Sequence, residues 1–440
     1  MNIPHSNLPR VVIVGGGFAG LNLAKKLSPK QFQVILLDKH NYHSFQPLLY
    51  QVATAGLEPD SIAYPLRKIF RSRDNFFFRM ADVSSINAQE KTITADIGEI
   101  SYDHLVIATG STTNFFGLDK IESLAMAMKT VPQSLDIRSL ILENLEKALL
   151  TNDLEEREAL MSTVIVGGGP TGVELAGALA ELKKHVLHRD YPDLDVRQMD
   201  IHLVEAAPRV LAAMSEEASE KAMCFLQEMG VTVWTDRRVS SYDGTTAIAE
   251  DCPPLRAKNL IWAAGVKGCP LEGLPAETVA GGQRIQVDEF NRIPQLEGVY
   301  AIGDTAVIIN EETPKGHAMV AQVAIQQGVN LAKNLKAWQN GSEARAFEYK
   351  DLGSMATIGR NKAVVDLPKF KTQGFFAWFI WMLVHIVQLV GFRNKLIVFM
   401  NWMYNYWRYS KDIRLIIRPF RRVQSVKEPS PLPAEQPDTR

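Results

Sequence analysis

The stretch VVIVGGGFAG at residues 11–20 places a glycine-rich turn directly after a short apolar run, and residues with helical spacing follow it. In such a turn one glycine makes the tight bend, one lets the backbone approach a pyrophosphate, and one lets the helix pack on the strand. The same pattern returns at residues 163–172 as TVIVGGGPTG. Two copies in the same context predict two dinucleotide sites.

An acidic residue at the end of the next strand would hold a ribose hydroxyl of each dinucleotide. In the first copy the run QVILLD ends at Asp38, at about the usual distance of ~20 residues. In the second copy HLVE ends at Glu205, after a longer crossover that contains the charged stretch 183–200. A helix extended by a few turns would absorb the excess. The alternative is that both turns are ordinary connections of a parallel sheet and bind nothing.

Length and composition exclude several classes. The 440 residues imply two to three domains, and the apolar content of 46% can fill their cores. A net charge of −1 argues against a nucleic-acid partner, although basic residues crowd one end of the chain. The three cysteines lie far apart without metal-ligand spacing, so we expect a reducing compartment and no metal. The N-terminus has no pattern of a secretory signal.

Three further apolar runs end in small residues, as parallel strands do where backbone approaches a cofactor. They end in Ala-Thr-Gly at 108–110, Ala-Ala-Gly at 263–265 and Gly-Asp at 303–304. With the two glycine turns, these runs resemble the flavoprotein reductases that have two dinucleotide-binding domains. In that superfamily the first fold and the late Gly-Asp bind FAD, and the inserted second fold binds a nicotinamide nucleotide.

The resemblance implies an α/β fold with two Rossmann-like dinucleotide-binding domains, one for FAD and one for NADH, plus a C-terminal amphipathic helical region that anchors the chain to a membrane. The expected FAD domain is discontinuous, at 1–118 and 281–350, and the NADH domain lies between, at 119–280. Residues 351–422 form the membrane-associating region. Residues 423–440, which contain four prolines, are expected to be a disordered tail.

The resemblance also assigns cofactor contacts. The FAD pyrophosphate would lie on the first turn, the adenosine ribose near Asp38 and Lys39, the adenine on the backbone of Val83, and the ribityl chain on Asp304. For Asp304 the alternative is an acid of an ordinary strand-end turn. The full set of expected cofactor-binding residues is Gly15, Gly17, Phe18, Ala19, Gly20, Asp38, Lys39, Val83, Ala108, Thr109, Gly110, Gly303, Asp304, Ala321 and Gln322 together with Gly167, Gly169, Gly172, Glu205 and Gly265.

The charge of Glu205 indicates which nicotinamide nucleotide is bound. A carboxylate at this position favours NADH over NADPH, because a 2′-phosphate would face a negative charge instead of an arginine. Arg209 is near enough in sequence to weaken this inference.

The segment after the first acid, residues 41–56, contains no cysteine. Many reductases of the superfamily carry a redox thiol there, so disulfide reductases and thiol peroxidases are disfavoured and the electrons must leave to an external acceptor. His43 has two interpretations: a proton donor, because the unperturbed pKa of histidine lies near 6.5, or a packed histidine in a turn. The second is favoured.

Four motifs resemble the type II NADH:quinone oxidoreductases, the single-subunit, non-pumping NADH dehydrogenases of respiratory membranes. They are FQPLLYQVA at 45–53, GVELAG at 172–177, WAAGV at 262–266 and AQVAIQQG at 321–328, and the resemblance covers residues 10 to about 420. It implies oxidation of NADH through FAD and two-electron reduction of a membrane quinone, menaquinone or ubiquinone. A homodimer is implied as well.

Three residues acquire catalytic roles from this resemblance. Glu174 resembles the family glutamate placed near the nicotinamide and the flavin, although an acid is also favoured by the N-terminus of a helix. Gln322 and Gln326 are four apart, so they share one helix face and could hydrogen-bond quinone carbonyls. The alternative for this pair is a solvated helix face.

The C-terminal region carries the membrane signal. Residues 374–392 have no formal charge and are long enough for one transmembrane pass, while 396–409 read as an amphipathic helix with a polar stripe. Between Arg393 and Arg422 there are eight basic residues and one acid, a composition that attracts anionic lipid. A buried core or dimer helix is the alternative. We expect a peripheral, monotopic membrane protein on the cytoplasmic face of the cell inner membrane.

Two other functions fit parts of the sequence. One is a soluble FAD reductase that hands electrons to a protein or to oxygen, and the lipid-like C-terminus argues against it. The other is a membrane-bound NADH-sensing flavoprotein that turns over too slowly to act as an enzyme.

Overall fold

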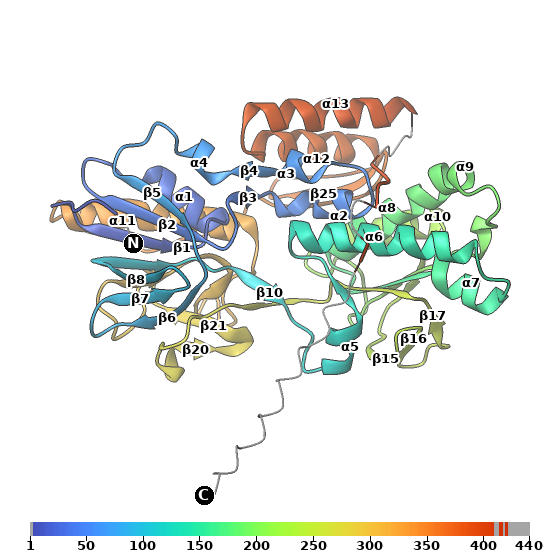
Figure 1. The fold of residues 1–440 in the computed structure, drawn as a ribbon, viewed down its shortest axis with the longest axis horizontal. Helices are drawn as coiled ribbons and strands as arrows, with labels where there is room; N and C mark the ends of the chain where they lie inside the picture. Colours follow the sequence, from blue (N-terminus) through green and yellow to red (C-terminus); the bar gives the residue numbers. More distant parts are fainter. Residues whose placement is uncertain (1–2, 409–412, 417–418, 421–440) are drawn as a thin grey trace, which may run out of the picture.

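The computed structural model describes residues 3–408, 413–416 and 419–420. Its framework is two parallel five-stranded sheets that lie side by side (Figure 1). In each sheet the strand that leads into a glycine turn, β1 or β12, lies at the centre, with the strand that leads to the acid, β2 or β13, on one side and β9 or β18 on the other. This order is that of the dinucleotide-binding fold.

The first sheet has the strand order β22-β9-β1-β2-β5 and is parallel throughout. The last of its strands in chain order, β22, comes from beyond residue 280, and it pairs with β9 from the N-terminal part of the chain. The bounds are β1 Arg10–Val14, β2 Gln33–Asp38, β5 Phe76–Met80, β9 His104–Ile107 and β22 Val299–Ala301.

The second sheet has the strand order β11-β18-β12-β13-β14 and is also parallel throughout. The predicted strands at the two glycine turns, and those before residues 108, 263 and 303, are all confirmed. The bounds are β11 Met126–Ala127, β12 Thr163–Val166, β13 Ile201–Val204, β14 Thr232–Trp234 and β18 Asn259–Trp262.

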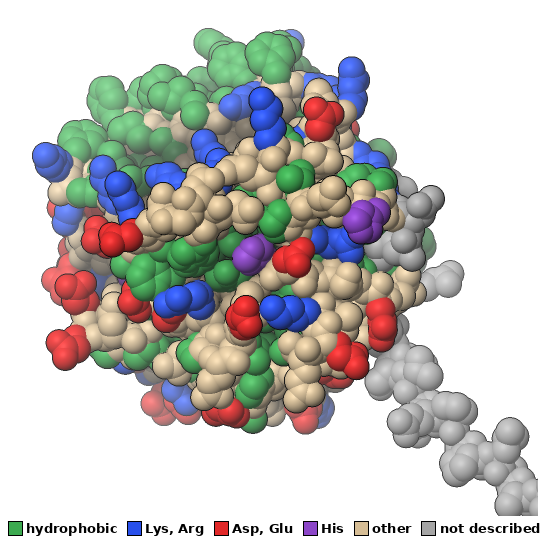
Figure 2. All heavy atoms as spheres, turned by 90° about the vertical axis from the view of Figure 1, so that its left-hand side faces the viewer, with side chains coloured by type: hydrophobic (Ala, Val, Ile, Leu, Met, Phe, Trp, Pro, Cys, Tyr) green, Lys and Arg blue, Asp and Glu red, His purple; other side chains and the backbone are tan. Residues whose placement is uncertain are grey.

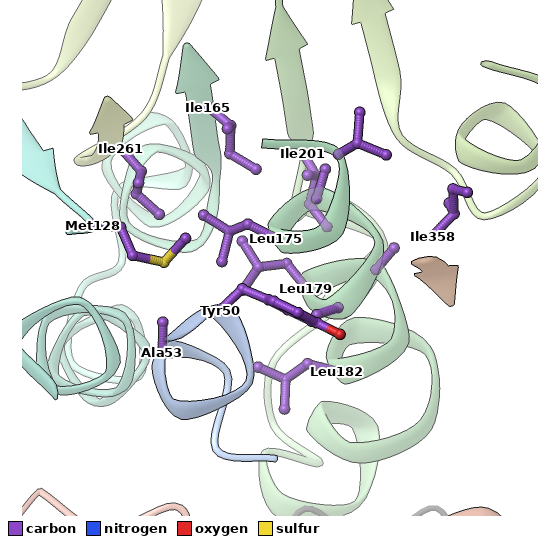
Figure 3. Close-up of a cluster of buried hydrophobic side chains, with 14 of the residues drawn as sticks. Tyr50, Ala53, Met128, Ile165, Leu175, Leu179, Leu182, Ile201, Ile261 and Ile358 are labelled. Atoms are coloured by element: carbon purple, nitrogen blue, oxygen red, sulfur yellow. The ribbon is translucent and has the colours of Figure 1, made fainter. Parts of the chain in front are cut away.

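Each sheet is covered by helices on one face and by a small antiparallel sheet on the other. On the first sheet, helix α1 (Phe18–Lys26) packs against α11 (Ala321–Gln339), and strands β6 to β8 (83–101) cover the opposite face. On the second sheet the helices are α6 (Val131–Ala148), α8 (Pro170–Leu182) and α10 (Glu216–Glu228), and strands β15 to β17 (239–256) cover the opposite face. Figure 3 shows the core beneath α8, where Ile165, Ile201 and Ile261 of the sheet meet Leu175.

The long crossover after the second turn is helical at its start, as predicted. Helix α8 continues through one π-helical turn at Lys183–Leu187 into α9 (His188–Asp190), and the 3₁₀ turn Val196–Gln198 leads to β13. Before this extension, α8 packs on β24 (Ser354–Gly359), the first strand of the C-terminal region, with Gly177 against Ile358.

The C-terminal region is a three-stranded antiparallel sheet followed by two helices. Strands β24, β25 (Lys362–Leu367) and β26 (Phe370–Gln373) form the sheet, and α12 (Phe375–Gln388) and α13 (Phe392–Arg408) lie over it. The uncharged run 374–392 is therefore not one helix, because the chain turns between α12 and α13 through Gly391, whose φ is +87°. Among the residues described, no helix is long and apolar enough to cross a bilayer.

The polar stripe of α13 faces the protein. Asn394 donates to the carbonyl oxygens of Asp60 and Ala63, Asn401 donates to the carboxylate of Glu58, and Trp402 donates to Gln51. Trp402 is itself buried. The predicted tail, 423–440, and most of the basic residues beyond Arg408 lie outside the described residues.

Large apolar side chains cover the outer face of both C-terminal helices, and we call this surface the apolar cap. Figure 2 shows it at the top of the molecule, with Lys and Arg side chains just below it. Its exposed members are Phe375, Phe376, Phe379, Leu383, Val387, Phe392, Leu396, Phe399, Met400, Met403, Tyr404 and Trp407. An exposed apolar surface of this extent marks a site of contact with lipid or protein.

Candidate active site

A single large cavity, of about 1080 Å³, runs between the two sheets and the C-terminal region. It lies at the carboxyl ends of the parallel strands, where ligands of such folds bind. Its size is at the upper end of the ~300–1,000 Å³ typical of ligand sites. Most of the predicted residues line it: Gly15, Gly17, Phe18, Ala19, Asp38, Lys39, Val83, Ala108, Thr109, Gly110, Glu174, Gly265, Gly303, Asp304, Ala321 and Gln322.

The glycines of the two turns have matching geometry. Gly15 and Gly167 both adopt φ +110°. A methyl group on Gly17 or Gly169 would meet no protein atom within 4 Å, so a pyrophosphate could lie directly against the backbone there. Both helices then begin with free N–H groups that favour an anion. The first turn and the cavity beside it therefore fit FAD.

The third glycine of each turn has a packing role and does not line the cavity. A methyl group on Gly20 would lie 1.9 Å from the carbonyl oxygen of Gly15, and one on Gly172 would lie 1.9 Å from that of Gly167. Gly167, Gly169 and Glu205 also lie outside the lining, although Pro170 and Thr171, which begin α8, are part of it.

The two acids hold their turns in the same way. Asp38 Oδ2 accepts the N–H of Gly16 at 2.6 Å, and Glu205 accepts the N–H of Gly168. Arg209, by contrast, is occupied: its guanidinium donates to the carbonyl oxygens of Met214 and Ala212 and to Ser219. It is therefore not free to meet a 2′-phosphate, which removes the objection to NADH preference.

Asp304 is held by two groups from much earlier in the chain. The Ser111 hydroxyl donates to Asp304 Oδ2 at 2.5 Å, and the Lys129 ammonium lies 3.6 Å from the same oxygen. Before it, Gly303 donates its N–H to the side chain of Gln327 at 2.7 Å. Asp304 is thus an ion-paired acid on the cavity wall. Neither Lys129, which precedes α6, nor Gln327, which lies within α11, was predicted, because a single polar residue gives no spacing signal.

Glu174 lies in the second turn of α8 and is buried, with 8% of its surface exposed. Burial raises its pKa to about 8, and the N–H of Thr357, 3.4 Å away, together with the Trp381 side chain lowers it in part. Near pH 7 this carboxyl is therefore mainly protonated, so it can donate a proton as well as a hydrogen bond.

The two glutamines of α11 are placed differently. Gln322 lines the cavity, but its amide donates to Gly353 and accepts from Leu352 and Tyr349. Gln326 does not line the cavity. Its amide donates to the carbonyl oxygen of Lys350 and accepts the N–H of the same residue. Both side chains hold the segment that leads into β24, and the predicted pair on a quinone is not brought together.

Two histidines are kept neutral by burial. The pKa of His43 is lowered to about 4, and its Nδ1 lies 3.0 Å from the carbonyl oxygen of Gly16, outside the cavity lining. The prediction of a packed histidine is confirmed. The pKa of His385, on α12, is also lowered to about 4, and this side chain lines the cavity beside Gln388. His385 and Gln388 are polar residues one turn apart on an otherwise apolar helix, a pattern from which this part of the site could have been found.

Comparisons with known proteins identify the class of protein. The family model of pyridine nucleotide-disulphide oxidoreductases matches residues 9–328, and that of the NDH2 C-terminal domain matches residues 352–407. The solved structure of NDH2 from Plasmodium falciparum in complex with NADH has the same fold, with a TM-score of 0.85 over 93% of this chain and 100% of that chain at 22% identity. Fold and site thus define a flavoprotein reductase with two dinucleotide-binding domains.

Two curated relatives give the family. The chain is 34% identical to the type II NADH:quinone oxidoreductase Ndh of Mycobacterium tuberculosis over 89% of its length and 87% of the relative. It is 30% identical to the internal alternative NAD(P)H-ubiquinone oxidoreductase A1 of Solanum tuberosum, over 90% and 86%. The chain belongs to the type II NADH:quinone oxidoreductase family. FAD is the cofactor and NADH the electron donor of this fold.

Proposed function

We propose that this chain oxidises NADH and passes two electrons to a quinone taken from the membrane, without moving protons across it. One observation carries the proposal: a single cavity is lined by the first glycine turn, by the start of α8 and by α12. The flavin side, the start of the donor-side helix α8 and the C-terminal helix α12 therefore border one shared cavity. A reductase for a soluble protein would not need its site beneath the apolar cap.

On the donor side the chain orients two ligands. The second turn and Glu205 would hold the NADH pyrophosphate and ribose, and Pro170, Thr171 and Glu174 would face the nicotinamide end. The first turn, Asp304 and Ala321 would hold FAD, which would supply the hydride acceptor and pass the electrons on in a separate step. Glu174, protonated near pH 7, can donate a hydrogen bond to either ligand.

On the acceptor side the lining comes from α12 and α11. Val384, His385 and Gln388 line the cavity from α12, and Gln322 lines it from α11. The Gln388 amide can donate to a quinone carbonyl. His385 Nδ1 lies 2.7 Å from the carbonyl oxygen of Trp381, so it carries the ring proton and leaves Nε2 as an acceptor for a quinol hydroxyl. In this proposal Gln326 is a positioning residue that acts through Lys350.

The apolar cap would insert into the cytoplasmic leaflet of the inner membrane. Arg393 and Lys395 begin α13 beside it and would attract anionic headgroups. Phe376, which is 71% exposed, gives the test. Phe376→Glu should reduce co-flotation with phosphatidylglycerol vesicles, whereas Leu150→Glu, a matched change at an apolar residue that is 85% exposed on the second domain, should not. Equal loss in both variants would contradict this placement.

The homodimer implied by the family remains part of the proposal. Light scattering of the detergent-solubilised protein, corrected for bound detergent, would give twice the chain mass. A monomer mass would contradict the homodimer.

The catalytic proposal is tested by anaerobic stopped-flow mixing of the holoenzyme, first with NADH and then with a short-chain quinone. Flavin absorbance should bleach and then recover. Bleaching without recovery would indicate a protein acceptor or a sensor, and no bleaching would remove NADH as donor. Glu174→Gln should slow the quinone-dependent step by about tenfold or more, as expected for loss of an acid–base group.

A further inference from the structure

One exposed aromatic side chain lies far from the apolar cap. Among the described residues, every exposed Phe, Tyr or Trp side chain lies between residues 370 and 407 except Phe116, which is 62% exposed. Phe116 belongs to the turn between β10 (Ser111–Thr113) and α5 (Asp119–Leu124), where the chain passes from the first nucleotide domain to the second. Figure 1 shows this turn on the side of the molecule opposite α12 and α13. Contact with lipid at the cap therefore does not account for this exposed ring.

The turn holds Phe116 in a backbone conformation that a bulky residue disfavours. Phe116 has φ +54° and Gly117 has φ +78°, and the N–H of Leu118 donates to the carbonyl oxygen of Phe115 at 3.0 Å. Left-handed backbone at both central positions defines a turn in which Gly, Asn and Asp are the favoured residues. Strained residues of this kind persist where the surrounding structure holds them, and they cluster at ligand clamps. A phenylalanine at this position therefore indicates a use for its ring.

Contacts with the end of β18 hold the turn in place. The Trp262 indole donates to the carbonyl oxygen of Asn114 at 2.9 Å, and the N–H of Asn114 donates to the carbonyl oxygen of Gly265 at 3.1 Å. Phe115 is buried, with its ring centre 5.5 Å from that of Trp262. One phenylalanine of the pair thus anchors the turn, and the other stays exposed at a fixed position.

The ring of Phe116 lies against the backbone of Gly265. A methyl group on Gly265 would lie 3.1 Å from Phe116 Cζ, so no side chain separates the ring from the main chain there. Gly265 lines the large cavity. The residue before it, Ala264, lies against the second glycine turn, because a methyl group on Gly167 would lie 2.7 Å from Ala264 Cα. Phe116 therefore stands at the rim of the cavity, beside the donor site.

The order of the strands indicates which part of NADH passes this rim. Glu205, proposed to hold the adenosine ribose, follows β13 on one side of β12, and Gly265 follows β18 on the other side. A dinucleotide lies across the carboxyl ends of such a sheet, with its pyrophosphate at the central turn. Its adenosine then points toward β13 and its nicotinamide riboside toward β18. The second direction leads to the first domain, because β19 (Val266–Gly268), which follows β18, pairs with β10.

We propose that Phe116 is a binding residue for the nicotinamide riboside half of NADH, on which its ring packs at the rim of the cavity. An aromatic ring offers a large apolar surface with few rotatable bonds, so it can cover a bound ring and ribose at little cost in entropy. Packing there also shields the reacting half of the donor from water. The inference rests on the proposed function and adds a contact for its donor.

Truncated nucleotides separate this contact from those of the adenosine half. Phe116→Asn removes the ring, and asparagine suits the left-handed turn, so flavin content should be unchanged. In anaerobic stopped-flow mixing of the holoenzyme, the dependence of flavin bleaching on donor concentration gives the Kd. We expect Phe116→Asn to raise the Kd about tenfold, both for NADH and for reduced nicotinamide mononucleotide, which lacks adenosine. The inhibition constant of ADP, which lacks the nicotinamide riboside, should not change.

Two further variants serve as controls. Phe116→Tyr keeps the ring and should bind NADH within about twofold of the wild type. Leu150→Asn, a matched change at an apolar residue that is 85% exposed after α6, should leave the Kd unchanged. Should Phe116→Asn lose its flavin, Phe116→Gly gives the same test, because glycine also suits this turn.

An unchanged Kd for NADH in Phe116→Asn would overturn the proposal. A loss of affinity that is absent with the mononucleotide, or a raised inhibition constant of ADP, would overturn it as well, because the ring would then contact the adenosine half. A wild-type protein that NADH does not bleach would instead contradict the proposed function itself.

Discussion

The two glycine turns are nearly identical, yet the helices that follow them pack against different partners. Each turn has a first glycine at φ +110°, a second with open space beside it and a third packed against the first. Helix α1 then packs on α11, where a methyl group on Gly328 would lie 2.4 Å from the carbonyl oxygen of Ala19. Helix α8 packs on β24, where a methyl group on Gly177 would lie 1.6 Å from that of Ile358.

The crossovers that follow the two turns also differ in length. The acid that holds the first turn follows 22 residues after its glycine, and the acid of the second follows 37 residues after its own. The longer connection extends α8 through Lys183–Leu187, beyond the part of the helix at Gly177 that packs on β24. Two positions after the third glycine, the first helix has Asn22, which bonds to its own helix at Phe18, and the second has Glu174. Under the proposed function, the same turn would serve a bound cofactor in one case and a reacting site in the other.

The largest effect is expected from the third glycines. Gly20→Ala forces a methyl group into the Gly15 carbonyl and should yield protein without flavin. Gly172→Ala makes the same clash in the second turn and should yield flavin-loaded protein that NADH hardly bleaches. Flavin content and bleaching rate are the measurements. Gly281→Ala, where a methyl group meets nothing within 4 Å, is the control. Loss of flavin in Gly172→Ala would show that the two turns are not independent.

Filling the open space beside Gly17 or Gly169 should have a smaller effect on nucleotide binding. Gly17→Ala and Gly169→Ala meet no protein atom within 4 Å, so the free energy of unfolding of the protein without nucleotides should not change. The methyl group would instead keep the pyrophosphate away from the backbone. We expect about tenfold weaker FAD binding for Gly17→Ala and about tenfold higher KM for NADH for Gly169→Ala, each worth roughly 1.4 kcal/mol. A lowered unfolding temperature of either apoprotein would contradict this account.

The ribose acid of the second turn gives the next comparison. Glu205→Ala should raise the KM for NADH by about tenfold, because a hydrogen bond to a charged group is lost, and should narrow the ratio of kcat/KM between NADH and NADPH. Arg209 is engaged with Met214, Ala212 and Ser219, so Arg209→Ala should not change that ratio. A change in the ratio for Arg209→Ala would mean that this arginine does reach the nucleotide.

The smallest effect concerns stability against pH. The pKa of Glu174 is about 8 in the folded chain and 4.5 as its ordinary value, so the unfolded state releases this proton first as pH rises. Glu174 therefore lowers stability progressively from pH 4.5 to 8. Glu174→Gln removes this loss, and its unfolding temperature, followed by flavin release, should exceed that of the wild type by a few degrees at pH 8 but not at pH 4.5. Equal differences at both pH values would place the carboxylate in a solvated site.

Much of the fold could be predicted from local pattern. The strand, glycine turn and terminal acid are contiguous or nearly so, and the demands of a tight turn and a close pyrophosphate restrict which residues fit. The strands at 104–107, 259–262 and 299–301 could be located from apolar runs that end in small residues. The amphipathic character of α13 could be predicted as well, because helical spacing is local. Which of its two faces packs against the protein could not be predicted.

The sequence by itself determined the two nucleotide folds, their order and the family. Only the tertiary structure decided which polar groups meet: that Gln326 bonds to Lys350, that Lys129 pairs with Asp304, that Arg209 is occupied, and that the asparagines of α13 face inward. The physical reason is range. Turn geometry and periodicity act over a few residues. The burial that raises the pKa of Glu174 instead arises where segments far apart in the chain pack together, and so does the smaller cavity of about 130 Å³ that this residue lines.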